Sequence, residues 1–132
     1  MKYAVIICRV LMGLGFVVFG ANILVPFLPQ PPMPEGTLMA QFVTVMTATN
    51  WMKLIGLFQF LGGLMVLSGR MAPLGLAFLA PVLVNILACH IFLENGQNLA
   101  PGLVFTLLEI FLIYAYRSHF KPLFSTSAKP TV

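Results

Sequence analysis

The chain has 132 residues, of which 60% are hydrophobic and only 8% charged, and its mean hydropathy is +1.01. A soluble domain carries roughly a quarter charged residues, so this composition excludes an ordinary soluble protein and indicates one membrane domain. The formal net charge is +4, but the cations are scattered singly and form no basic cluster, so nucleic-acid binding is not expected.

Four apolar segments are long enough to cross a bilayer. We predict spans at about 3–28, 51–69, 71–93 and 98–116. The first span is interpreted as a retained anchor rather than a cleaved signal peptide, because Arg9 interrupts its apolar run, which continues to Leu28. The predicted fold is therefore an all-α integral membrane four-helix bundle. It forms a single transmembrane domain over 1–124, followed by a flexible cytoplasmic tail at 125–132.

The only sizeable connection follows the first span and begins with "PQPPMP" at 29–34. Each proline fixes its own φ angle and disfavours helix in the preceding residue, so this part is predicted to be extended. The next stretch, "EGTLMAQFVTVMTA" at 35–48, places Leu38, Phe42 and Val45 at the spacing of one helix face. A proline-rich outer loop with a short amphipathic helix is therefore expected.

The distribution of lysine and arginine predicts the orientation. If both termini are cytoplasmic, only Lys53 lies on the outer side. The cations on or near the cytoplasmic side are then Lys2, Arg9, Arg70, Arg117, Lys121 and Lys129. This bias favours an N-in, C-in, multi-pass protein of the cell inner (cytoplasmic) membrane.

Small residues predict which helix faces touch, since helices in lipid associate through close packing. Gly13 and Gly20 are seven residues apart in the first span, and Gly56 and Gly63 repeat this spacing in the second. The other predicted inward stripes are Gly102, Thr106, Glu109 and Tyr116 in the fourth span, and Pro81, Asn85 and Ala88 in the third.

Two charged residues are expected to meet within the bundle. At 1.5 Å per residue, Arg9 lies ~10 Å and Glu109 ~12 Å from the cytoplasmic side. An unpaired charge at such depth costs at least ~2.5–3.5 kcal/mol. We therefore predict an intramembrane Arg9–Glu109 ion pair, and leave open whether it is a structural staple or has a functional role.

A second polar group is predicted farther toward the outer side. The candidate interior ligand-binding site consists of Asn22, Gln59, Asn85 and His90. Pro81 precedes Asn85 by one turn and removes a backbone donor, which suits a kink beside a cavity. The alternatives are an interhelical hydrogen bond for Asn85 and an interfacial position for His90, beside Glu94.

The sequence contains few motifs that would indicate catalysis or metal binding. The sequence has no serine-nucleophile motif, no paired carboxylates and no histidine spacing suited to haem or metal. No catalytic residue and no metal site are predicted, and enzymatic turnover is left open.

Several stretches resemble, in order and spacing, the DoxX family of small bacterial membrane proteins. After Arg9 these are "MGLGFVVFGANIL", "PPMP", "ATNWM", "QFLGGLMVLSGR", "APLGLAFLAPVLVNILACHIFLE" and "YAYRSHFKPL". The resemblance extends to about Leu123 and implies a four-helix membrane bundle. It also implies an association with quinone-linked sulfur oxidation, or with membrane assemblies that handle thiol or oxidative stress.

The expected function is a quinone-proximal or anchoring subunit of a membrane redox complex, with a quinone as candidate cofactor. The expected partners are the lipid bilayer and either a redox protein or a second copy of the chain. Two alternatives stay open: a non-enzymatic lipid-binding, small-molecule-binding or assembly protein, and a small transporter. The predicted pairing of Glu109 with Arg9 argues against the transporter.

Overall fold

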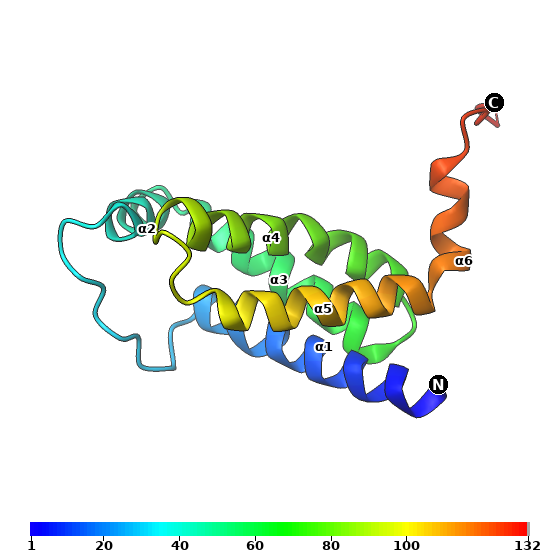
Figure 1. The fold of residues 1–132 in the computed structure, drawn as a ribbon, viewed down its shortest axis with the longest axis horizontal. Coiled ribbons are helices and arrows are strands. Elements are labelled where there is room, and N and C mark those ends of the chain that lie inside the picture. Colours follow the sequence, from blue (N-terminus) through cyan, green and yellow to red (C-terminus); the bar gives the residue numbers. More distant parts are fainter. Residues whose placement is uncertain (132) are drawn as a thin grey trace.

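The computed structural model describes residues 1–131, and within them the chain is helical, without strands (Figure 1). The helices are α1 (Lys2–Leu24), α2 (Leu38–Ala48), α3 (Trp51–Ser68), α4 (Ala72–Phe92), α5 (Leu99–Ala115), α6 (Arg117–Phe120) and the 3₁₀ helix η1 (Lys121–Phe124). The all-α prediction is confirmed. Of the predicted tail at 125–132, residues 125–131 contain a turn but no helix, and Val132 lies outside the described residues.

Local sequence explains where the helices begin and end. Val25 ends α1 in an extended conformation (φ −135°, ψ 97°), as expected for a residue that precedes a proline, here Pro26. The Thr37 side chain caps α2 by accepting a hydrogen bond from the backbone N–H of Ala40. Gly69 closes α3 in the left-handed region (φ 75°), which glycine adopts without steric cost.

The long helices α1, α3, α4 and α5 lie side by side and alternate in direction (Figure 1). At one end, here called the termini end, lie the N-terminus, the turn between α3 and α4, and α6. At the opposite end, here called the α2 end, lie the loop at 25–37, α2, and the turn at 93–98. Helices α1, α3 and α4 are each long and apolar enough to cross a membrane. Helix α5 qualifies together with the segment Arg117–Phe124, which bends away from it by 78°.

Helices α1 and α3 pack backbone against backbone through glycine. A Cβ atom on Gly13 would lie 2.7 Å from the backbone nitrogen of Leu67, and one on Gly20 would overlap the backbone of Phe60 in the same way. From the other side, a Cβ on Gly63 would lie 2.9 Å from the carbonyl oxygen of Gly13. The glycine stripes predicted as contact faces of the first and second spans therefore do lie in helix contacts, and the structure pairs these two helices with each other.

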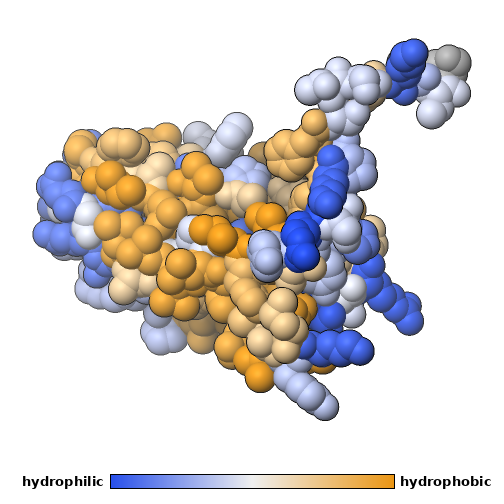
Figure 2. Space-filling view, turned by 45° about the vertical axis from the view of Figure 1, so that its right-hand side comes forward, coloured by the Kyte–Doolittle hydropathy of each residue, from blue (hydrophilic) through white to orange (hydrophobic). Residues whose placement is uncertain are grey.

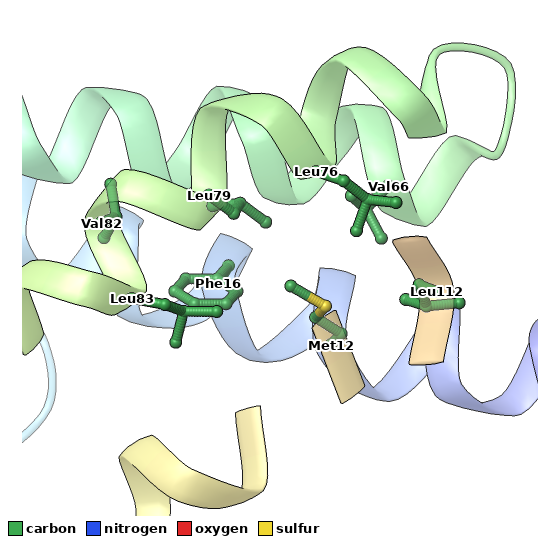
Figure 3. Close-up of a cluster of buried hydrophobic side chains, with 8 residues drawn as sticks. All are labelled: Met12, Phe16, Val66, Leu76, Leu79, Val82, Leu83 and Leu112. Atoms are coloured by element: carbon green, nitrogen blue, oxygen red, sulfur yellow. The ribbon is translucent and has the colours of Figure 1, made fainter. Parts of the chain in front are cut away.

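Large apolar side chains fill the centre of the bundle, where they point inward from α1, α3, α4 and α5 (Figure 3). This core consists of Met12, Phe16, Val66, Leu76, Leu79, Val82, Leu83 and Leu112. It lies between the two ends of the bundle. Polar side chains toward the α2 end and toward the termini end are thereby kept apart by apolar packing.

The inward face of α4 differs from the predicted stripe. Pro81 and Asn85 are exposed, and the buried positions include Gly75, Leu79 and Leu83 instead. Gly75 lets α4 approach α3 closely, because a Cβ there would lie 2.7 Å from the carbonyl oxygen of Gly62. This contact fixes the rotation of α4 and turns the proline and the amide outward.

Helix α2 forms as predicted but packs with a different face. Leu38 and Val45 are exposed, whereas Phe42, Val43 and Met46 are half-buried. Apolar residues occur around much of this short helix, so the sequence pattern alone does not select a face. Contact with α3 selects it, and the outward leucine and valine leave α2 apolar on its exposed side.

The molecular surface divides into an apolar middle and polar ends. In Figure 2 hydrophobic residues cover the side of the bundle, and hydrophilic residues gather toward its two ends. Exposed large apolar residues include Leu14 of α1, Leu64 of α3 and Ile110 of α5. Large apolar exposure of this extent is typical of a protein whose surroundings are themselves apolar, and it indicates a membrane protein.

Candidate functional site

A cavity of about 700 Å³ lies at the α2 end of the bundle. Its walls come from α1, α3, α4 and α5, and residues of the 25–37 loop and of α2 also line it. Its volume falls in the range of roughly 300–1,000 Å³ that is usual for small-molecule sites. It brings together side chains from six segments of the chain.

Aromatic residues form one wall of this cavity. The ring of Phe105 in α5 packs edge-on against Phe16 and Phe19 of α1, with centroid separations of 5.1 Å and 6.3 Å. A Cβ on Gly15 would overlap the Phe105 ring, so this glycine is what admits the aromatic side chain between the helices. The wall offers an apolar aromatic surface against which the ring of a ligand could pack.

Gln59 of α3 supplies a buried polar group to the cavity. The residue is only 5% exposed, and no side-chain hydrogen bond among residues 1–131 involves its amide. Most buried amides in proteins have a partner, because an unpartnered one forfeits its hydrogen bonds to water. Gln59 lines the cavity, so its amide is available to a bound molecule.

His90 of α4 lines the same cavity and lies nearer the α2 end of the bundle. Its Nδ1 atom lies 2.5 Å from Oε2 of Glu94, four residues along the chain. The carboxylate therefore orients the imidazole ring. Lys53, in the first turn of α3, contributes a cation to the lining.

Asn22 of α1 also lines the cavity and is 5% exposed. Its Oδ1 atom accepts hydrogen bonds from the backbone N–H groups of Phe27 at 2.9 Å and Leu28 at 2.7 Å. This residue thus anchors the start of the 25–37 loop over the end of α1. It has a structural task, and only its amide nitrogen is left for a ligand.

The fourth predicted site residue lies elsewhere. Asn85 is on the exposed side of α4 and is not part of the cavity lining, so the structure joins only Asn22, Gln59 and His90. The cause is the rotation of α4 set by its contact with α3 through Gly75.

The predicted ion pair between Arg9 and Glu109 is not formed in the structure, where the ion pair found within residues 1–131 is His90–Glu94. Arg9 instead donates from Nη1 to the hydroxyl oxygen of Tyr116 at 3.4 Å, and its guanidinium lies against Gly69. Glu109 is 4% exposed, and both of its carboxyl oxygens are buried without a hydrogen-bond partner.

The direction in which helical side chains lean explains why Arg9 and Glu109 do not pair. A helical side chain leans toward the N-terminus of its helix, and α1 and α5 run in opposite directions. Arg9 therefore leans toward the termini end and Glu109 toward the α2 end, so that the two side chains diverge. The same rule makes Gln59 of α3 and His90 of α4 lean toward each other, one from each end of the cavity.

Several lining residues were not among the predicted site residues. Lys53 is interpreted from the sequence only as a topology signal. Phe105 has an apolar side chain, and Thr47 and Met33 lie in segments outside the expected spans. The one available indication was that Lys53 precedes Gln59 by six residues, ~9 Å along the helix, on the outer side of the second span.

The arrangement is suited to binding. The cavity combines an aromatic wall with a few separated polar groups, as in sites that hold small amphipathic molecules. Within residues 1–131 no cluster of three or more histidine, cysteine or acidic side chains could hold a metal ion. In comparisons with known proteins, no family model, no curated protein and no solved structure matches this chain.

Proposed function

We propose that α1, α3, α4 and α5 cross the cytoplasmic membrane of a bacterium, with both termini in the cytoplasm. The apolar sides and polar ends of the bundle support insertion into a membrane (Figure 2), and the distribution of cations supports the orientation. The termini end carries most of the cations, including Lys2, Arg70 and Arg117, whereas the α2 end carries Lys53. The bent segment Arg117–Phe124, with exposed Leu123 and Phe124, would then lie along the cytoplasmic interface.

Within this membrane setting, we propose that the chain is a DoxX-like protein that binds a quinone in the cavity at the α2 end. It would serve a membrane redox complex as its quinone-proximal or anchoring subunit. The single observation that carries the binding proposal is Gln59: a buried amide without a protein partner, in an otherwise apolar cavity. The redox assignment comes from the resemblance of the sequence to the DoxX family.

The cavity suits a quinone in shape and polarity. A quinone head group is a flat ring with polar atoms at its edge and an apolar tail. The rings of Phe16 and Phe105 give the head group an aromatic wall to pack against, and Gln59 offers an amide that can donate or accept. The protein itself would contribute binding and orientation, while electron transfer would belong to the quinone and to a partner protein.

A second candidate is a non-enzymatic lipid-binding or assembly protein. The observation in its favour is that Lys53 lines a largely apolar cavity, which is also the pattern needed for an anionic headgroup and an acyl chain. In this case the cavity would hold a phospholipid and have no redox function.

Native mass spectrometry of the protein purified in mild detergent tests the proposal, with quinones and lipids identified in its organic extract. We expect one quinone per chain in the wild type and its loss in Gln59→Leu. Asn85→Leu is the matched control, because it removes an amide from an exposed position outside the cavity. Phospholipid alone, bound equally by all three proteins, would contradict quinone binding and favour the second candidate.

A further inference from the structure

The hydrogen bonds at the cavity determine which polar atoms remain for a ligand, and of which kind. At Asn22 the amide oxygen accepts from two backbone N–H groups, those of Phe27 and Leu28. These two donors fix the orientation of the amide, since its NH₂ group cannot take the place of the oxygen there. The group left over at Asn22 is therefore a donor.

At His90 the group left for a ligand is an acceptor. An ionised carboxylate only accepts hydrogen bonds, so Nδ1 of His90 must carry the hydrogen that bonds to Glu94. In the neutral imidazole the other ring nitrogen, Nε2, is then a bare acceptor. Since His90 lines the cavity, we take this acceptor as the polar atom that it offers to a bound molecule.

Gln59 is the one polar group of the cavity that can act either as donor or as acceptor. No protein group within residues 1–131 orients its amide, so the amide can turn to present either its oxygen or its nitrogen. The three polar groups of the cavity are therefore one donor at Asn22, one acceptor at His90, and one group at Gln59 that adapts to either.

From this pattern we infer that the cavity selects a ligand that has a hydroxyl group for His90, and hence the hydroquinone rather than the quinone form. The inference rests on the proposed function and names which redox form is the ligand. A hydroquinone hydroxyl donates to Nε2 of His90, and its second oxygen accepts from Asn22 or Gln59. A quinone has only acceptors, and its carbonyl would face the lone pair of Nε2.

The expected size of the preference follows from the lost hydrogen bond. Two acceptors that face each other in the cavity leave each other without a hydrogen bond, and such a mismatch at one position corresponds to a preference of about tenfold or more. The contact between Glu94 and His90 controls the preference, although Glu94 itself does not line the cavity.

The test is equilibrium binding of one matched pair of probes, a short-chain benzohydroquinone and its benzoquinone, to the full protein in nanodiscs. Measurements at neutral pH under anaerobic conditions keep both probes in their assigned forms. We expect the hydroquinone to bind at least about tenfold more tightly to the wild type. In Glu94→Gln the new amide can donate to Nδ1, which lets Nε2 carry the hydrogen, and the preference should collapse or invert.

Glu35→Gln is the matched control, because it removes the other carboxylate of the α2 end without touching His90, and it should keep the preference. Equal binding of the two probes by the wild type, or tighter binding of the quinone, would overturn the inference and leave the proposed function standing. An unchanged preference in Glu94→Gln would also overturn it. Binding of neither probe would overturn the inference together with the proposed function.

Discussion

Gln59 and His90 approach the same cavity from opposite ends, because the helices that carry them run in opposite directions. The pair combines a buried amide that lacks a protein partner with an imidazole held by Glu94. Neither group bonds one long helix to another within residues 1–131. The proposed ligand site therefore makes predictions that differ from those for a structural polar contact.

Replacing Gln59 by leucine should stabilise the empty protein while it weakens ligand binding. The substitution removes a buried polar group that has no partner, and we expect the free energy of unfolding to rise by about 1 kcal/mol. Reversible unfolding in mixed micelles with increasing SDS measures this change. A loss of more than about 1 kcal/mol would mean that Gln59 has a structural partner within the bundle.

The contact between α1 and α3 should be intolerant of a single methyl group at Gly63. A Cβ there would lie 2.8 Å from the backbone nitrogen of Val17, and backbone cannot move aside as a side-chain end can. We expect Gly63→Ala to destabilise the protein by about 1–3 kcal/mol, measured by the same unfolding experiment.

Gly102→Ala is the matched control for the glycine contact. Its Cβ would meet side-chain ends and no backbone, namely Leu87 Cδ2 at 3.1 Å and Ile86 Cγ2 at 3.5 Å, and alanine has a higher helix propensity than glycine. This variant should be neutral or more stable by up to about 1 kcal/mol. Equal destabilisation by both substitutions would show that the packing of α1 against α3 is not especially tight.

Arg9 and Glu109 should contribute to stability independently. A double-mutant cycle with Arg9→Met and Glu109→Leu is expected to be additive within about 0.5 kcal/mol, because the structure has no ion pair between them. Glu109→Leu alone should be neutral or stabilising, since both carboxyl oxygens lack partners. A coupling energy above about 1 kcal/mol would contradict this expectation and support the ion pair predicted from the sequence.

Asn22 should be required for the loop at 25–37 to hold its place beside the cavity. Replacement by leucine leaves the N–H groups of Phe27 and Leu28 without their acceptor, at a cost of about 1–3 kcal/mol. Limited proteolysis of the loop should be faster in this variant than in the wild type. Asn85→Leu is again the control, and equal cleavage rates in the two variants would argue against the anchoring role.

Much of the fold can be predicted from the sequence because its signals are local. The length of the apolar runs gives the four long helices, and the spacing of Gly13, Gly20, Gly56 and Gly63 marks the contact faces of α1 and α3, although the pairing of these two helices comes from the structure. The first predicted span ran past the observed end of α1, although Pro26 marks that end.

The rest depends on information that the sequence pattern does not carry. Helix α4 is apolar on all sides, so its polar residues were the only guide to its inward face, and the contact through Gly75 overrides them. Equal depth placed Arg9 beside Glu109, but depth along a helix axis omits the direction in which each side chain leans. The cavity forms only when the loop at 25–37 and α2 lie against the four long helices. The sequence of one segment therefore cannot predict it.

The most direct test of the central claim, that the cavity at the α2 end holds a quinone-type ligand, is photo-crosslinking with an azido-quinone followed by peptide mapping. We predict labelling on the segments that contain Gln59 and His90, and competition by an unlabelled quinone or hydroquinone. Labelling confined to the termini end, near Lys2 and Arg117, or spread evenly over the lipid-facing sides, would contradict the claim.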